Sequence, residues 1–307
     1  MGKLDRIPAG VYKVLIVVAT MIWGYSFVVM KDVVEVVPPA WLLGLRFVSA
    51  GIILCAILHK RLARSMSVKV LGMGAVLGVL DFSAFFAQTV GLQHTTPGIN
   101  AFLTATYCVI VPFLWWILAR RRPTVFNVGA AVLAVAGIWL VSVSSSGEGL
   151  SLGLGEGLTL LCALFFAIHI VCVSKFSRFA DVLVLTAVQF VTEGLCGLVL
   201  GAGTEAFPAA ALADPAILAQ FAFLVLFASI VAFGIQNVAL AYVPPAQASL
   251  LLSLESVFGV VFSILLYGET MTLRLVVGFA LIFVAIVVSE TFPLKKKRAS
   301  SSAEGAA

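Results

Sequence analysis

Five ionisable side chains stand inside long apolar stretches of this sequence: Arg46, Asp81, His169, Glu193 and Glu255. An ionised side chain at the centre of a lipid bilayer costs at least about 2.5–3.5 kcal/mol on insertion scales, so each of them needs a partner or a function. Burial also disfavours the charged form of a carboxyl group, which lets such a group bind and release a proton near neutral pH. These residues therefore favour ligand binding and proton exchange.

Glu255 is the leading candidate for a working carboxylate because it lies near the middle of its apolar stretch. The alternative is a neutral, hydrogen-bonded carboxyl that only packs. Asp81 could work in the same way or pair locally. His169 could be a proton partner or contact a ligand, although a lone histidine of this kind is more often a packing residue. Arg46 is interpreted as structural, since about two turns separate it from the outer end of its stretch and it could pair with an outer acid such as Glu35.

Further polar side chains share expected helical faces with these groups. The spacing i, i+4, i+7 puts Asp81, Phe85 and Gln88 on one face, and it does the same for Asn100, Thr104 and Tyr107. Trp23 could form an apolar wall of a cavity or pack as an ordinary aromatic residue. The candidates for substrate binding or coupling are Glu255, Tyr107, Asp81, Gln88, Asn100, His169, Gln236, Asn237 and Trp23.

The composition requires a membrane environment. Of 307 residues, 62% are apolar and 11% are charged, whereas soluble domains are about 45–50% apolar and 25% charged. The five cysteines lie in apolar runs, without the spacing of a disulfide framework or a zinc site. The net charge of +5 is typical of the lysine and arginine that membrane proteins gather on their cytoplasmic side. We expect no cofactor, no metal and no nucleic-acid partner.

Ten apolar segments are long enough to cross a bilayer as helices, which takes about 20 residues each. They are residues 14–30, 40–58, 70–92, 99–119, 124–143, 157–174, 182–203, 217–241, 246–267 and 275–292. Residues 222–227 are apolar on every face, which excludes the alternating pattern of a membrane β-barrel. The predicted fold is an all-α integral membrane protein with ten transmembrane helices.

Basic residues predict the orientation of these helices. With the N-terminus inside, the outer loops hold only Lys31 and Arg274, and Arg46 lies within a span. The other sixteen basic residues are cytoplasmic: Lys3, Arg6, Lys13, Lys60, Arg61, Arg64, Lys69, Arg120, Arg121, Arg122, Lys175, Arg178, Lys295, Lys296, Lys297 and Arg298. Both termini are therefore predicted in the cytoplasm, with the chain in the cytoplasmic membrane.

The sequence contains an internal repeat. A shift of about 148 residues superposes the third and fourth spans on the eighth and ninth, pairing Gln88 with Gln236, Pro97 with Pro245 and Tyr107 with Glu255. We expect two five-helix repeats, residues 1–145 and 146–293, followed by a basic disordered cytoplasmic tail, residues 294–307. Because five is odd, the second repeat enters the membrane inverted, an arrangement that places substrate sites between the halves of other transporters. The alternative is a duplication kept only for packing.

Short motifs follow one another in a characteristic order. They are Trp23-Gly24-Tyr25-Ser26-Phe27, Leu45-Arg46-Phe47, the turn from Gly91-Leu92 to Pro97, and Tyr267-Gly268-Glu269. Together with the ten-span repeat, they make the chain from Val14 to Phe292 similar to the drug/metabolite transporter superfamily, specifically its ten-helix EamA-type branch. One departure is Arg120-Arg121-Arg122-Pro123, which stands where family members often carry a turn like Gly268-Glu269.

The resemblance implies a secondary carrier for small metabolites, commonly an exporter, with a cavity lined mainly by the first, third, fourth, sixth, eighth and ninth spans. It also makes Glu193, on the peripheral seventh span, a weaker candidate. Because intramembrane acids outnumber bases, we expect an amino acid or amine as substrate, moved by alternating access with protons as a candidate coupling ion.

Two other functions, a membrane-embedded enzyme and a channel, stay open at this point. The sequence has no HExxH or GxSxG motif and no loop long enough for a soluble active site, so we expect no enzyme. Glycine pairs with GxxxG spacing are too common in this glycine-rich chain to predict a dimer, and the protein could be a monomer or a homodimer.

Overall fold

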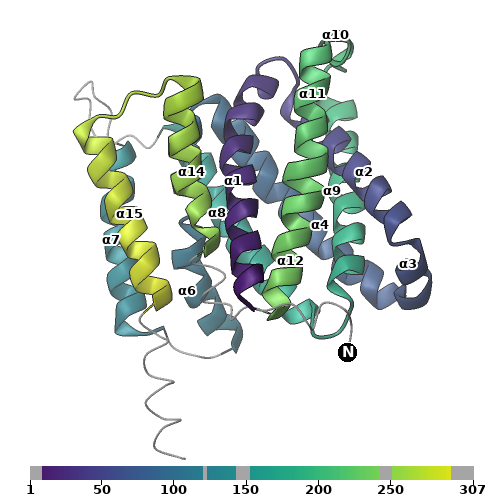
Figure 1. Cartoon of the computed structure of the whole chain (residues 1–307), viewed down its shortest axis with the longest axis horizontal. Helices are drawn as coiled ribbons and strands as arrows, with labels where there is room; N and C mark the ends of the chain where they lie inside the picture. Colours follow the sequence, from purple (N-terminus) through teal and green to yellow (C-terminus); the bar gives the residue numbers. More distant parts are fainter. Residues whose placement is uncertain (1–8, 120–122, 143–152, 243–250, 292–307) are drawn as a thin grey trace, which may run out of the picture.

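The computed structural model describes residues 9–119, 123–142, 153–242 and 251–291. Within these ranges the chain is built from helices, with no strand. The long helices run side by side as one bundle, and the start of α1 and the end of α15 lie at the same end of it (Figure 1). The predicted tail, residues 294–307, and the predicted repeat boundary at residues 145–146 lie outside the described residues.

The helices follow the predicted apolar stretches closely. The first half contains α1 (Ala9–Val34), α2 (Pro39–Ile57), α3 (His59–Ser65), α4 (Val68–Gln93), α5 (Pro97–Thr104), α6 (Tyr107–Ala119) and α7 (Val125–Ser142). The second half contains α8 (Leu154–Phe176), α9 (Val182–Thr204), α10 (Ala209–Leu212), α11 (Pro215–Phe223), the π-helix η2 (Leu224–Val231), α12 (Ala232–Tyr242), α14 (Leu254–Phe262), the π-helix η3 (Ser263–Tyr267) and α15 (Leu273–Thr291).

Length and hydropathy identify most of these helices as membrane spans. In the described ranges, seven are long and apolar enough to cross a bilayer, and three shorter apolar helices are Val125–Val141, Leu254–Tyr267 and Leu273–Ser289. The prediction of an all-α, multi-pass membrane protein is therefore confirmed.

The fourth predicted span is not the single continuous helix that the sequence suggested. It is broken between α5 and α6, where the amide of Cys108 bonds the carbonyl of Ala105 at 3.1 Å in the tighter i to i+3 pattern. The ninth span has a similar turn at Ser253, where the amide of Ser256 bonds the carbonyl of Ser253 at 3.2 Å. Ser253 follows Ala105 by the 148-residue shift of the repeat, so the two breaks occupy equivalent positions.

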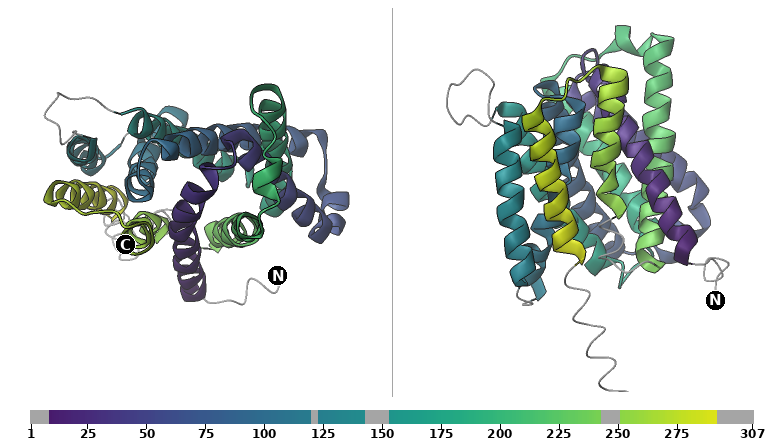
Figure 2. Two further views of the ribbon diagram at one scale, coloured as in Figure 1. Left: turned by 90° about the horizontal axis from the view of Figure 1, so that it is seen from above. Right: turned by 60° about the vertical axis from the view of Figure 1, so that its left-hand side comes forward.

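Close packing joins helices from the two halves of the chain. Helix α2 packs on α9, α7 on α15, α4 on α8, and α1 on both α12 and α14. Figure 2 shows from above and from the side that α7 and α15 form a pair at one edge of the bundle. Since lipid is as apolar as the helices, van der Waals packing and hydrogen bonds between helices must hold the fold together.

Candidate functional site

A cavity lies between the two halves of the bundle. It encloses about 620 Å³ of empty space, including its open mouth. Its walls come from α1, α2, α4, α5 and α6 of the first half and from α8, α12 and α14 of the second. The residues that line it are Trp23, Ser26, Phe27, Met30, Arg46, Asp81, Phe85, Gln88, Thr104, Tyr107, Phe166, His169, Ile170, Phe233, Gln236 and Glu255.

Aromatic rings form much of the cavity wall. Phe85 meets Phe166 edge to face with 5.0 Å between ring centroids, and Trp23 meets Phe233 in the same way at 5.4 Å. The indole Nε1 of Trp23 donates a hydrogen bond to the carbonyl of Ala228 at 2.8 Å, within the wide turns of η2. This bond fixes the orientation of the indole ring and leaves its apolar faces to pack.

Tyr107 and Glu255 meet in the cavity, as their repeat-equivalent positions suggest. The Tyr107 hydroxyl lies within hydrogen-bonding reach of the Glu255 carboxyl, and both side chains are less than a tenth exposed. Tyr107 begins α6 and Glu255 lies in the first turn of α14, so each directly follows a helix break. The positive end of the α14 dipole favours negative charge on Glu255, whereas burial favours the neutral acid.

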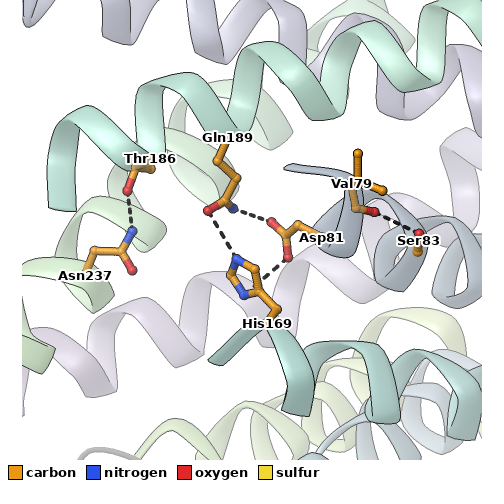
Figure 3. A network of polar contacts seen from close by, with 7 residues as sticks. All are labelled: Val79, Asp81, Ser83, His169, Thr186, Gln189 and Asn237. Carbon is orange, nitrogen blue, oxygen red and sulfur yellow. Dashed lines mark hydrogen bonds and ion pairs between the residues drawn. The ribbon is translucent and has the colours of Figure 1, made fainter. Parts of the chain in front are cut away.

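A second polar cluster joins three helices at the cavity wall (Figure 3). Gln189 of α9 donates from Nε2 to Oδ2 of Asp81 at 2.6 Å, and its Oε1 lies 3.1 Å from Nε2 of His169. Since the Gln189 oxygen can only accept, His169 donates from Nε2. The other ring nitrogen of His169 lies 3.8 Å from Oδ1 of Asp81. Gln189 thus fixes the two ionisable groups, which both line the cavity.

Arg46 does not reach outward to an acid such as Glu35, contrary to the partner that the sequence suggested. It is 1% exposed and lines the cavity. Its Nε donates to the Ser229 hydroxyl at 2.8 Å, and its guanidinium carbon lies 4.7 Å from the Phe47 ring centroid and 5.2 Å from that of Phe85. The reason is that π-helix η2 brings Ser229 close to α2, and two aromatic faces give the cation a favourable environment in place of Glu35.

Two charged side chains cap helix ends at the turn between α4 and α5. Glu269 accepts hydrogen bonds from the Thr96 hydroxyl and, at 3.1 Å, from the Gly98 amide, so it caps the N-terminus of α5. The Lys31 ammonium donates to the carbonyl of Leu92 at 2.7 Å, at the C-terminal end of α4. Both charges complement the helix dipole that they contact. These contacts give the Gly268-Glu269 turn a physical role in this chain.

Comparisons with known proteins identify the family. The sequence profile of the EamA-like transporter family matches residues 11–143 and again residues 153–291. The chain belongs to the EamA-like transporter family. Membership makes it a transporter rather than an enzyme, with a small-molecule substrate and a lipid environment.

Named relatives agree with this assignment to the EamA family. An uncharacterized transporter of Archaeoglobus fulgidus is 27% identical over 87% of this chain and 82% of its own length. The uncharacterized transporter YvbV of Bacillus subtilis is 24% identical over 97% of both chains. A WAT1-related chloroplastic protein of Arabidopsis thaliana is 28% identical over 86% of this chain and 66% of its own.

A solved crystal structure shares the fold of this EamA protein. The two superpose with a TM-score of 0.66 at 17% sequence identity, over 91% of this chain and 95% of the other. At this identity the likeness concerns the arrangement of helices alone.

Seven of the nine candidates named from the sequence of this EamA chain line the cavity, and two do not. Asn100 is fully buried and donates to the Thr159 hydroxyl at 2.8 Å, and Asn237 donates to the Thr186 hydroxyl at 2.6 Å. Both amides join helices beside the cavity instead of facing it. Gln88 keeps its place in the wall, where its Nε2 donates to the Thr104 hydroxyl at 3.0 Å.

Sequence reasoning missed other parts of the wall. Phe166, Ile170 and Phe233 line the cavity, but nothing in an apolar stretch distinguishes them from lipid-facing residues. Ser26 could have been found, because it lies one helical turn from Trp23 on the same face. Thr104, which the sequence places on the face of Asn100 and Tyr107, does line the cavity. In the described ranges, no group of three or more His, Cys, Asp or Glu side chains is placed to hold a metal ion.

Proposed function

We propose that this EamA protein is a proton-coupled secondary carrier that exports a small amino acid or amine across the cytoplasmic membrane by alternating access. The observation that carries the proposal is the cavity between the halves, with an ionisable carboxyl of the second half against a tyrosine hydroxyl of the first. Apolar walls with a few convergent polar groups are typical of sites for small organic molecules.

The proposal includes ten spans arranged as two inverted repeats, residues 1–145 and 146–293. The double match of the family profile supports it. The helix contacts also support it. If each helix is replaced by its equivalent in the other half, the α1–α12 contact becomes the α8–α4 contact, and the α2–α9 and α7–α15 contacts stay the same. All of these contacts are present. The breaks before Tyr107 and Glu255 resemble the discontinuous helices that form the sites of other inverted-repeat transporters.

Alternating access needs an outer end that opens and closes. In the proposed cycle the bonds of Glu269 to Thr96 and Gly98, which join the two halves, hold it closed. These bonds break when the cavity opens outward.

Reporter fusions test the proposed topology. The basic-residue bias predicts cytoplasmic signals for fusions after Arg64, Arg122, Arg178 and Lys297, and external signals after Glu35, Glu148 and Asp214. A cytoplasmic signal at Glu148 would leave the two halves in the same orientation and remove the inverted repeat.

An untargeted metabolite comparison of cells with and without the protein tests the proposed substrate class. Asp81, Glu193 and Glu255 outnumber Arg46 within the spans, so we expect cationic or zwitterionic compounds to accumulate outside the cells that contain the protein. The same cells with an empty vector are the control. Selective movement of organic anions would count against the proposal.

A further inference from the structure

Glu193 of α9 is a completely buried carboxyl group outside the cavity lining. It is 0% exposed, and no group in the described part of the chain donates a hydrogen bond to either of its oxygens. Oδ1 of Asp81, also 0% exposed, lacks a donor among the same residues. A buried, ionised carboxylate that accepts no hydrogen bond carries a large desolvation penalty. These oxygens therefore require a proton or a nearby cation.

The carboxyl groups of Glu193 and Asp81 face each other across the contact between α9 and α4. At Gly78, an added Cβ would lie 2.6 Å from the Gln189 carbonyl and 3.1 Å from the Glu193 amide, so the two backbones almost touch here. Asp81 follows Gly78 by nearly one turn, and its carboxyl lies within hydrogen-bonding reach of that of Glu193. Two carboxylates cannot bond to each other, whereas a carboxylic acid and a carboxylate can.

The surrounding charges favour one proton on this pair. Arg46 on α2 is the permanent cation that interacts with both acids. His169 on α8 already uses Nε2 for Gln189, and its Nδ1 is 3.8 Å from Asp81, beyond hydrogen-bonding distance. With one proton between the two acids, their single remaining negative charge balances the Arg46 cation.

We propose that Asp81 and Glu193 form a proton-binding site that holds one resident proton between the two carboxyl groups. Arg46, Asp81 and Glu193 then carry no net charge together. The shared proton then supplies the hydrogen bond that the Glu193 oxygens and Oδ1 of Asp81 otherwise lack in the described part of the chain. The pair acts as one site, so the proton belongs to both acids.

This site has a consequence for selectivity, which rests on the proposed carrier function. If the Arg46, Asp81 and Glu193 groups sum to zero charge, Glu255 is the remaining carboxyl group of the cavity wall in the described ranges. A cation or the ammonium group of a zwitterion is then the natural occupant. The resident proton itself does not depend on transport, because it is present in the resting protein.

Infrared spectroscopy of the purified protein in lipid tests the site without a substrate. The parent is expected to show the carbonyl stretching band of a protonated carboxyl at neutral pH, shifted in D2O. Glu193→Gln should lose this band, since the glutamine amide donates to Asp81 and Asp81 ionises against Arg46. Asp81→Asn should also lose it, because Glu193 then supplies the balancing negative charge.

Glu255→Gln is the matched control, because it removes another buried acid and should retain the band of the pair. Size-exclusion chromatography checks that each variant is folded. If Glu193→Gln does not fold, the spectrum of Asp81→Asn tests the proposal instead. A protonated-carboxyl band that is unchanged in both pair variants overturns the proposal. So does the absence of any such band from Glu255→Gln, which would place the proton on His169 or leave the pair ionised.

Discussion

Gly197→Val is expected to eliminate folded protein from detergent extracts. A Cβ at Gly197 of α9 would lie 2.5 Å from the amide nitrogen of Gly44 in α2 and 2.8 Å from the carbonyl oxygen of Ala40. These neighbours are backbone atoms, so only a separation of the two helices could relieve the clash. Overpacking typically costs about 1–3 kcal/mol and sometimes more, and in lipid little besides packing holds two helices together.

Gly203→Val is the control, because it lies on the same helix and an added Cβ there has no neighbour within 4 Å. Both variants are compared with the parent by size-exclusion chromatography and thermal unfolding in the same detergent. The control should elute and unfold like the parent. A Gly197→Val variant with the parent's yield and melting temperature would contradict the close α2–α9 packing, and with it the positions of Arg46 and Glu193.

Composition predicted the membrane fold because a bilayer imposes a simple length rule. Each stretch of about 20 apolar residues must form a helix to satisfy its backbone. All ten predicted stretches have helix in the described residues, but the sequence did not reveal the breaks at Ala105 and Ser253. A break of this kind depends on tertiary contacts, and residues 101–106 carry no glycine or proline to signal it.

The cavity was predicted less completely, for a physical reason. An intramembrane polar residue is conspicuous because lipid disfavours it, which is why Asp81, His169 and Glu255 could be named. The energetic cost of burying a polar side chain does not indicate whether its partner is a ligand or a residue of another helix. Asn100 and Asn237 have helix partners, and Arg46 faces the cavity because of π-helix η2, whose geometry no local sequence pattern indicates.

Glu255→Gln is expected to abolish accumulation driven by a pH gradient while substrate exchange continues. Glutamine keeps the shape of the side chain and can still bond the Tyr107 hydroxyl, but it cannot titrate. In the proposed cycle Glu255 releases its proton on one side of the membrane and regains it on the other, because its hydration differs between the two states. Without that proton, the carrier can only equilibrate its substrate.

Glu35→Gln is the matched control, since Glu35 is an exposed acid just beyond the end of α1. Its accumulation should equal that of the parent. If Glu255→Gln accumulates substrate like the parent, the carboxyl is structural, and Asp81 and His169 become the next residues to test for coupling.

Counterflow in proteoliposomes tests the carrier assignment most directly. Vesicles that contain the purified protein are loaded with the compound found by the metabolite comparison and diluted into a trace of labelled compound. The account predicts a transient uptake of label above equilibrium for the parent and for Glu255→Gln. It predicts accumulation under a pH gradient for the parent but not for Glu255→Gln. A parent protein that equilibrates the label without an overshoot would be a channel, and the alternating-access account would be wrong.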